Sequence, residues 1–197
     1  GRYFTSAILL SLVVFSIYSL FTGSGTLSLY KVGGWEPVNR IPIGIYMVMD
    51  GFTVIVLCII NIIGFLSAFY SISYIKRYTS ENFYYALFCL MTAGMNGVVL
   101  SGDLFNIFVF MEISVIAAYA LVAFGVEKNE LEATFKYQVL GCLASFMILI
   151  GIGFIYWKAK TLNIADIKEV LSSGYDRTYY LVVQILILSG FGLKAAI

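Results

Sequence analysis

The sequence contains no histidine and few charged residues. The absence of histidine among its 197 residues excludes a Ser-His-Asp triad, a haem held by two histidines and a zinc site built on histidines. Charged residues make up 12% of the chain, whereas a soluble domain has about 25%. Hydrophobic residues make up 61%, more than a soluble globule of this size can bury. We therefore expect an integral membrane protein.

The three cysteines and the balanced charge exclude further classes of function. Cys58, Cys89 and Cys142 each lie alone inside an apolar run and form no CxxC pair, so we expect no metal site. The net charge is +1 without basic clusters, which argues against a nucleic-acid partner. Nothing in the sequence indicates a flavin or an iron–sulfur cluster. We expect no cofactor, and no redox chemistry in this chain alone.

Six segments are long and apolar enough to cross a membrane. A transmembrane helix needs about 20 mostly apolar residues, because the hydrocarbon layer is about 30 Å thick. The first segment has a longer apolar core than a signal peptide and no cleavage site of the A-x-A type, which favours a membrane span. The predicted fold class is all-α, a polytopic transmembrane helix bundle that forms a single transmembrane region over residues 1–197. The segments are 4–22, 46–72, 82–100, 104–124, 132–157 and 178–197.

Two connections are long enough to have structure of their own. Residues 23–45 are rich in Gly, Pro and aromatic side chains, which predicts a turn-rich loop at the membrane surface. Residues 164–171 have apolar side chains at helical spacing, which predicts a short interfacial helix. At the start of the fifth segment, Asn129 and Glu132 have the spacing of a capping box. That start would place Lys136 about two turns inside the helix.

Glu112 is the charged residue that we expect deepest in the membrane. An ionisable side chain in hydrocarbon costs about 2.5–3.5 kcal/mol, so such residues mark candidate functional sites. Glu112 lies eight residues after Leu104, which is about 12 Å along the helix and close to the membrane midplane. Its own segment contains no Lys or Arg. We predict a proton-handling or ion-pairing site; the structural alternative is a neutral acid that hydrogen-bonds between helices.

Two lysines also fall inside predicted spans. Lys194 follows Gly190 and Gly192, which would let the helix unwind nearby, as in the broken helices of transporters. Lys136 lies in the fifth segment. For both, the alternative is a lysine that extends to the membrane surface. A line of Glu112, Lys136 and Lys194 would be able to pass protons, since buried lysines change protonation readily.

Other polar and small residues have structural interpretations. Asp50 and Asp103 lie at predicted helix starts, where an acidic side chain caps the helix. Glycines within the spans predict close helix contacts, and these are Gly94, Gly97, Gly141, Gly151 and Gly153.

Three stretches resemble a family of antiporter-like membrane subunits. Ser101-Gly-Asp-Leu-Phe-Asn-Ile-Phe-Val-Phe-Met-Glu112 is similar to the fifth helix of that family. The family includes the D-type component of Mrp-type Na+/H+ antiporters and the proton-pumping subunits of complex I and of membrane-bound hydrogenases. Glu130-Leu-Glu-Ala-Thr-Phe-Lys-Tyr137 resembles the start of the sixth helix, and Gly190-Phe-Gly-Leu-Lys194 resembles the approach to the lysine of a broken seventh helix. The resemblance covers essentially the whole chain and is greatest for the Mrp D type.

The resemblance implies a larger protein with two inverted repeats, in which this chain is helices two to seven of about fourteen. The start at Gly1 rather than Met also predicts a fragment. In the family, the glutamate of helix five pairs with the lysine of helix seven, near the lysine of helix six. These proton-translocating roles fall on Glu112, Lys194 and Lys136.

The resemblance also implies a location and partners. We expect a multi-pass protein of the cell membrane, the prokaryotic plasma membrane. It would lie in the lipid bilayer beside other membrane subunits of a hetero-oligomeric antiporter or respiratory complex. The expected transported ions are protons or Na+.

The sequence therefore predicts a proton- or cation-translocating antiporter-like membrane subunit. The alternative is a proton-pumping membrane subunit of a respiratory NADH-quinone oxidoreductase or a membrane-bound hydrogenase, so membership of an enzyme stays open. A third interpretation is a structural subunit whose buried charges only set the register of the helices. Charge-neutral variants would then impair assembly and not ion flux.

Overall fold

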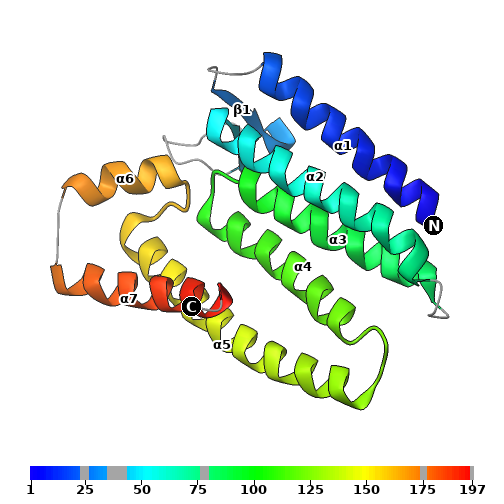
Figure 1. Ribbon diagram of the computed structural model, residues 1–197. Helices are drawn as coiled ribbons and strands as arrows, with labels where there is room; N and C mark the ends of the chain where they lie inside the picture. Colours follow the sequence, from blue (N-terminus) through cyan, green and yellow to red (C-terminus); the bar gives the residue numbers. More distant parts are fainter. Residues whose placement is uncertain (23–26, 35–43, 76–79, 174–176, 196–197) are drawn as a thin grey trace. The chain divides into compact units, whose positions relative to one another are not determined.

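A computed structural model describes residues 1–22, 27–34, 44–75, 80–173 and 177–195 (Figure 1). These residues are mainly helical, and the predicted all-α fold class is confirmed. In chain order the elements are α1 (Arg2–Thr22), β1 (Ser28–Lys31), a short 3₁₀ turn (Val32–Gly34), β2 (Tyr46–Met49), α2 (Gly51–Tyr74), α3 (Glu81–Leu100), α4 (Leu104–Val122), α5 (Lys128–Ala159), α6 (Ile164–Ser173) and α7 (Arg177–Lys194).

Five helices of the described residues, α1 to α5, are long and apolar enough to cross a membrane. They correspond to the first five predicted segments, and the predicted multi-pass membrane topology is confirmed. The sixth predicted segment forms α7, which has 18 residues and is not among these five helices. The predicted count of six spans is therefore approximate.

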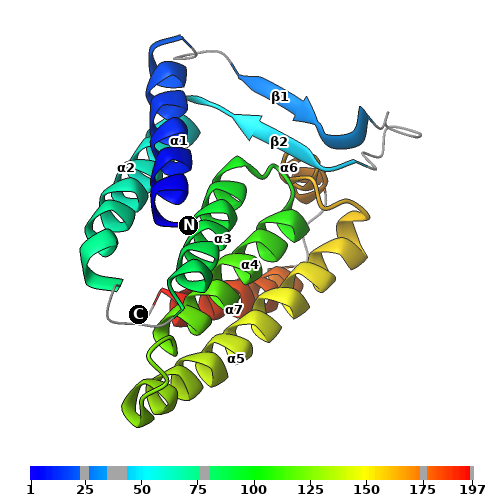
Figure 2. The ribbon, with the colours of Figure 1, turned by 90° about the vertical axis from the view of Figure 1, so that its right-hand side faces the viewer.

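The predicted loop over residues 23–45 contains a strand that the sequence did not suggest. β1 pairs with β2 in a two-stranded sheet, which Figure 2 shows from the side. The chain turns after β1 through Gly33 and Gly34, whose φ angles of 79° and 68° suit glycine. Residues 46–49 are therefore strand, and the second membrane helix begins at Gly51. Residues 23–26 and 35–43 of this loop lie outside the described part of the chain.

The chain forms two compact units. The first comprises Gly1–Leu29, Val48–Leu100 and Phe110–Thr134, and the second comprises Tyr30–Met47, Ser101–Val109 and Phe135–Ile197. The first unit therefore holds α1, α2, α3 and most of α4. The second holds most of α5 together with α6 and α7. By this division Glu112 belongs to the first unit, and Lys136 and Lys194 belong to the second.

In the first unit, helices α1, α2 and α3 lie side by side (Figures 1 and 2). Leu9, Ala68 and Phe88, one from each helix, form a buried apolar cluster. A partly exposed ion pair between Arg2 and Glu81, at 3.8 Å, joins the starts of α1 and α3. An ion pair that is largely open to solvent contributes little to stability.

A ladder of three uncharged polar side chains also crosses this bundle. Asn96 Nδ2 of α3 donates to Asn61 Oδ1 of α2 at 2.8 Å, and Asn61 Nδ2 donates to Ser16 Oγ of α1 at 2.7 Å. Ser16 Oγ in turn donates to the carbonyl of Leu12 in its own helix. The polar ladder of Ser16, Asn61 and Asn96 thus connects all three helices inside an apolar environment.

Close contact between α3 and α4 depends on two glycines of α3. A Cβ atom at Gly94 would lie 2.7 Å from the backbone nitrogen of Ser114, and one at Gly97 would overlap the ring of Phe110. Only a residue without a side chain fits at either position. The predicted contact role of Gly94 and Gly97 is confirmed.

In the second unit, α5 and α7 pack through glycines from both helices. A Cβ atom at Gly151 would lie 2.5 Å from Ile187 Cγ1, and one at Gly190 would lie 2.8 Å from the carbonyl oxygen of Ala144. Gly190 is therefore a packing residue, and α7 is continuous from Gly190 through Gly192 to Lys194, so the helix does not unwind at either glycine. The predicted contact at Gly153 is also wrong, because a Cβ atom there would have no atom within 4 Å.

The predicted cap of α2 is correct, and the predicted start of α5 is displaced. Asp50 caps α2 by accepting from Thr53 N at 2.8 Å, and this backbone hydrogen bond lowers the pKa of Asp50. At the start of α5, Glu127 N donates to the Glu130 carboxylate at 3.3 Å, which is one of the two hydrogen bonds of a capping box. The prediction of Asn129 and Glu132 is therefore wrong by two residues.

The predicted helix at residues 164–171 is confirmed as α6, and its position at the membrane interface stays a prediction. Its start is fixed by Asn163, whose Oδ1 accepts from Ala165 N at 3.0 Å.

Candidate functional site

A short connector between α3 and α4 fixes the start of the helix that carries Glu112. Gly102 N donates to the carbonyl of Tyr46 at 2.9 Å, and Gly102 O accepts from Ile164 N at 3.1 Å. Leu104 N donates to the carbonyl of Leu162 at 2.9 Å. The connector, Ser101–Asp103, is therefore hydrogen-bonded on both edges, to the β2 segment and to the turn before α6.

The same stretch caps α4 with its own side chains. Asp103 Oδ1 accepts from Asn106 N at 2.9 Å, which confirms the predicted cap. Asn106 Nδ2 donates to Ser101 Oγ at 2.8 Å, and both residues are buried. Much of the Ser101–Asn106 sequence thus has a structural explanation, since it satisfies backbone and side-chain groups where α4 begins.

Glu112 lies in the middle of α4. It is the ninth of 19 residues and is partly buried. Successive residues of an α-helix are rotated by about 100°, so Glu112 is turned by about 160° from both Phe110 and Ser114. Those two residues contact the glycines of α3. Glu112 therefore lies on the face of α4 that points away from α3.

Lys136 and Lys194 lie toward the same end of the α5–α7 pair. Gly151 packs on Ile187 and Gly190 packs on Ala144, so the two helices run antiparallel. Lys194 comes one turn after Gly190 and continues the face of α7 that contacts α5. Lys136 precedes Ala144 by two turns, which puts the two lysines within about 10 Å of each other along the helix axis. The side chain of Lys136 is exposed and that of Lys194 is partly buried.

The three candidate residues are thus divided between the two units. Glu112 lies in the first unit, and the two lysines lie in the second. The structure gives the position of each residue in its helix, and their action as one proton line stays a prediction. Within the described ranges, no group of three or more His, Cys, Asp or Glu is arranged to hold a metal ion.

The polar ladder was not predicted from the sequence. Asn61 is 3% exposed in the middle of α2, and Asn96 carries an oxygen that is buried without a hydrogen-bond donor among the described residues. The sequence feature that could have indicated the ladder is an asparagine inside each of two apolar spans, Asn61 and Asn96. Because an uncharged amide costs less to bury than a charged group, it is a weaker signal than Glu112 or a lysine.

Comparison with known proteins shows which family the chain resembles. Residues 101–197 match the family described as NADH:quinone oxidoreductase/Mrp antiporter, transmembrane. These residues are therefore similar to the antiporter-like membrane subunits. The resemblance predicted from Ser101–Glu112 and the two lysine-containing stretches is thereby confirmed.

Two curated relatives of this antiporter-like chain have different names. The D-type component of the Na(+)/H(+) antiporter of Bacillus subtilis is 36% identical over 182 residues, which are 92% of this chain and 36% of the relative. The N-type component of the NADH-quinone oxidoreductase of Desulforudis audaxviator is 35% identical over 170 residues, which are 85% of this chain and 33% of the relative. The antiporter-like chain thus spans about a third of the length of each.

A solved structure extends the match to the fold. The membrane-bound sulfane sulfur reductase, an archaeal respiratory membrane complex, contains a chain with a TM-score of 0.88 and 32% identity. The match covers 97% of this antiporter-like chain and 38% of that chain. A chain of the Mrp complex from Dietzia sp. DQ12-45-1b has a TM-score of 0.84 and 28% identity over 99% of this chain and 36% of that chain. Chains of an antiporter complex and of a respiratory complex are therefore similar in fold to this one.

Proposed function

We propose that this chain is part of a proton- or cation-translocating membrane subunit in which Glu112, Lys194 and Lys136 carry protons. The observation that carries the proposal is an acidic residue at the middle of the apolar helix α4. A carboxyl group at that depth is costly, so a functional role is the default interpretation. The family match supports ion translocation as the class of function.

In the proposed mechanism, Lys194 holds the proton and Glu112 determines how tightly it is held. A negative charge near the ammonium group stabilises the protonated lysine, and this attraction is much stronger in a low-dielectric interior than in water. Opening the ion pair would release the proton to a hydrated chain of polar groups. Lys136 would relay or modulate the transfer.

The test measures proton flux in membrane vesicles that contain the full-length protein in its complex. We expect Glu112→Gln and Lys194→Ala to abolish flux and to leave assembly intact, since each removes one partner of the pair. Glu132→Gln is the matched control, because it removes the same charge from the exposed first turns of α5. Wild-type flux in Glu112→Gln would refute the proposal.

Lys136 has a distinct expected effect. Its side chain is exposed within the described chain, and it lies toward the end of the α5–α7 pair that carries Lys194. Lys136→Gln should reduce flux without abolishing it if this lysine relays protons. Full flux in this variant would restrict the proton line to Glu112 and Lys194.

The second candidate is a proton-pumping subunit of a respiratory complex, in which partner subunits carry out the redox chemistry. The relative from the NADH-quinone oxidoreductase and the chain from the sulfane sulfur reductase complex favour it. Purification of the full-length protein with its partners separates the two candidates. Co-purifying redox subunits would support the respiratory role, and their absence beside other antiporter-type subunits would support antiport.

The third interpretation, a structural role for the buried charges, makes the opposite prediction for assembly. Under it, Glu112→Gln and Lys194→Ala would reduce the amount of assembled complex. The flux per assembled complex would stay at the wild-type value.

A further inference from the structure

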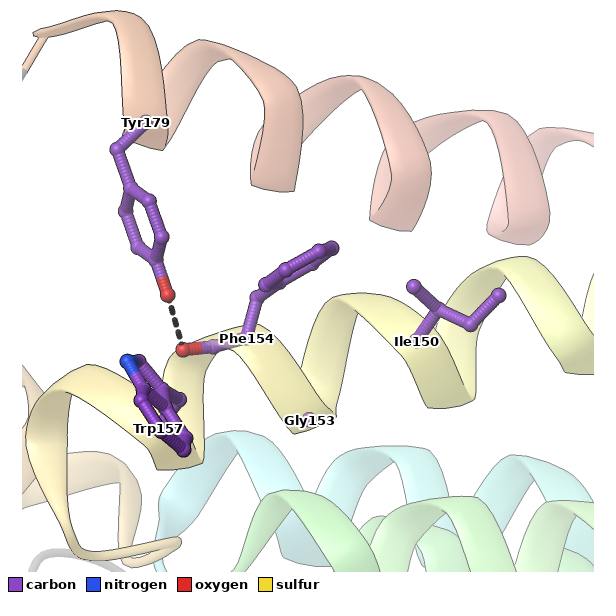
Figure 3. A pocket seen from close by; sticks show the side chains of 5 residues that line it. All are labelled: Ile150, Gly153, Phe154, Trp157 and Tyr179. Carbon is purple, nitrogen blue, oxygen red and sulfur yellow. Dashed lines mark hydrogen bonds between the residues drawn. The ribbon is translucent and has the colours of Figure 1, made fainter.

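An open groove of about 430 Å³ runs between α5 and α7 in the second unit (Figure 3). Tyr179 of α7 reaches across, and its hydroxyl donates to the carbonyl of Phe154. The rings of Phe154 and Tyr179 also meet edge to face, with centroids 6.0 Å apart. The lining is almost entirely apolar and consists of Ile150, Gly153, Phe154, Trp157 and Tyr179.

Gly153 has a role in this groove that differs from that of its neighbour Gly151. Gly151 is in tight contact with Ile187, whereas a side chain at Gly153 would have open space around it. Gly153 is therefore not needed for helix packing. Because Gly153 has no side chain, open space is left beside α5 at this position.

The groove ends beside a cationic group at the C-terminus of α5. Lys160 follows the last helical residue with a φ of 56°, and its backbone nitrogen donates to the carbonyl of Tyr156 at 2.9 Å. Its Nζ atom lies 4.7 Å from the centre of the Trp157 ring. Tryptophan and lysine are characteristic of the membrane–water interface, which places this end of the groove at the level of lipid headgroups.

We propose that the groove binds an acyl chain of an anionic phospholipid, with Lys160 beside the phosphate. The distance along α5 from Trp157 to Ile150 is about 10 Å, so the groove runs from the interface into the hydrocarbon layer. An apolar lining and a cation at its outer end match the two parts of such a lipid. A helix with its side chains is about 10–12 Å wide, so the space left by the missing side chain of Gly153 suits an unbranched acyl chain better than a helix.

The principal test measures how much anionic phospholipid purifies with the full-length protein in its complex. Gly153→Leu fills the groove with a side chain that meets no atom within 4 Å, so we expect less bound lipid and normal assembly. Gly192→Leu is the matched control, because Gly192 is another helical glycine with open space around it, outside the groove. Lipid should fall in Gly153→Leu and stay unchanged in Gly192→Leu. Unchanged lipid in Gly153→Leu would overturn the proposal.

Two further measurements test the headgroup and the occupant. Lys160→Asn removes the charge while keeping a residue that tolerates positive φ, and it should weaken binding of vesicle phosphatidylglycerol about fivefold. A photo-crosslinking side chain at Ile150 should form adducts with lipid. Adducts with a protein segment instead would show that protein covers the groove and would overturn the proposal.

Discussion

Two helix interfaces, α1–α2 in the first unit and α5–α7 in the second, are held by different means. In the first unit, the inner faces of α1 and α2 bury the uncharged polar residues Ser16 and Asn61, which are linked by hydrogen bonds. In the second unit, α5 and α7 approach through Gly151 and Gly190. Lipid supplies no hydrophobic force between helices, so each interface needs another source of attraction. Here one uses hydrogen bonds and the other uses close backbone contact.

This difference predicts different sensitivities. The polar ladder needs each partner to be present, because a buried donor left without an acceptor is costly. The glycine contacts need the absence of a side chain, because added atoms have no space to occupy. The α1–α2 interface should therefore respond most to lost polar groups, and the α5–α7 interface should respond most to added volume.

The largest expected effect is from Gly190→Val. Its Cβ atom would lie 2.8 Å from the backbone oxygen of Ala144, which cannot move without shifting α5. We expect a loss of about 3 kcal/mol in the free energy of unfolding, measured by denaturant titration in detergent micelles. Gly192→Val is the control, because a Cβ atom there meets no atom within 4 Å. Equal losses in both variants would contradict the packing role of Gly190.

Asn61→Leu should have the next largest effect. It removes the middle of the polar ladder and leaves Asn96 Nδ2 without its acceptor. We expect a loss of about 1–2 kcal/mol in the same unfolding measurement. Ser16→Ala removes one hydrogen bond at the end of the ladder and should cost less. A larger loss in Ser16→Ala than in Asn61→Leu would refute the proposed order.

Exposed polar contacts should contribute less than the polar ladder. Glu130→Ala removes the acceptor for Glu127 N at the start of α5 and should cost about 0.5 kcal/mol, read from the thermal midpoint of the purified protein. Asn129→Ala lies within the helix and should leave the midpoint unchanged. A lower midpoint in Asn129→Ala and an unchanged midpoint in Glu130→Ala would show that Asn129 and Glu132 form the capping box.

The smallest expected effect is a pH dependence from Asp50. Its hydrogen bond from Thr53 N lowers the pKa below the ordinary value of 3.8. The stabilisation from the charged cap is therefore complete above pH 3.8 and is lost as the pH falls through the lowered pKa. Asp50→Asn keeps a capping side chain that does not titrate. Wild type should lose stability relative to Asp50→Asn in acid, and parallel pH profiles would refute this.

Features that depend on local sequence were predicted well. The apolar segments located the membrane helices, because span length follows from the thickness of hydrocarbon. Asp50 and Asp103 were recognised as caps from their positions at helix starts. The helix at residues 164–171 followed from the spacing of its apolar residues.

Features that depend on a distant partner were not predicted. β1 and β2 pair across residues separated in sequence, and neither strand is long enough to be recognised alone. Gly151 and Gly153 look equivalent in sequence, but only the rotation of α5 relative to α7 decides which one contacts Ile187. The start of α5 contains two overlapping capping spacings, Glu127 with Glu130 and Asn129 with Glu132. In the structure, the hydrogen bond from Glu127 N to the Glu130 carboxylate shows that the first spacing is used.

The hydrogen bonds of the connector Ser101–Asp103 limit how Glu112 is able to move. Because Gly102 is bonded to Tyr46 on one edge and to Ile164 on the other, twisting the first turn of α4 about its axis would break backbone bonds in two other segments. A reorientation of Glu112 during turnover would then arise from its side-chain torsions, or from bending of α4 beyond its first turn. The hydrogen-bonded start of α4 would then be the fixed point for either motion.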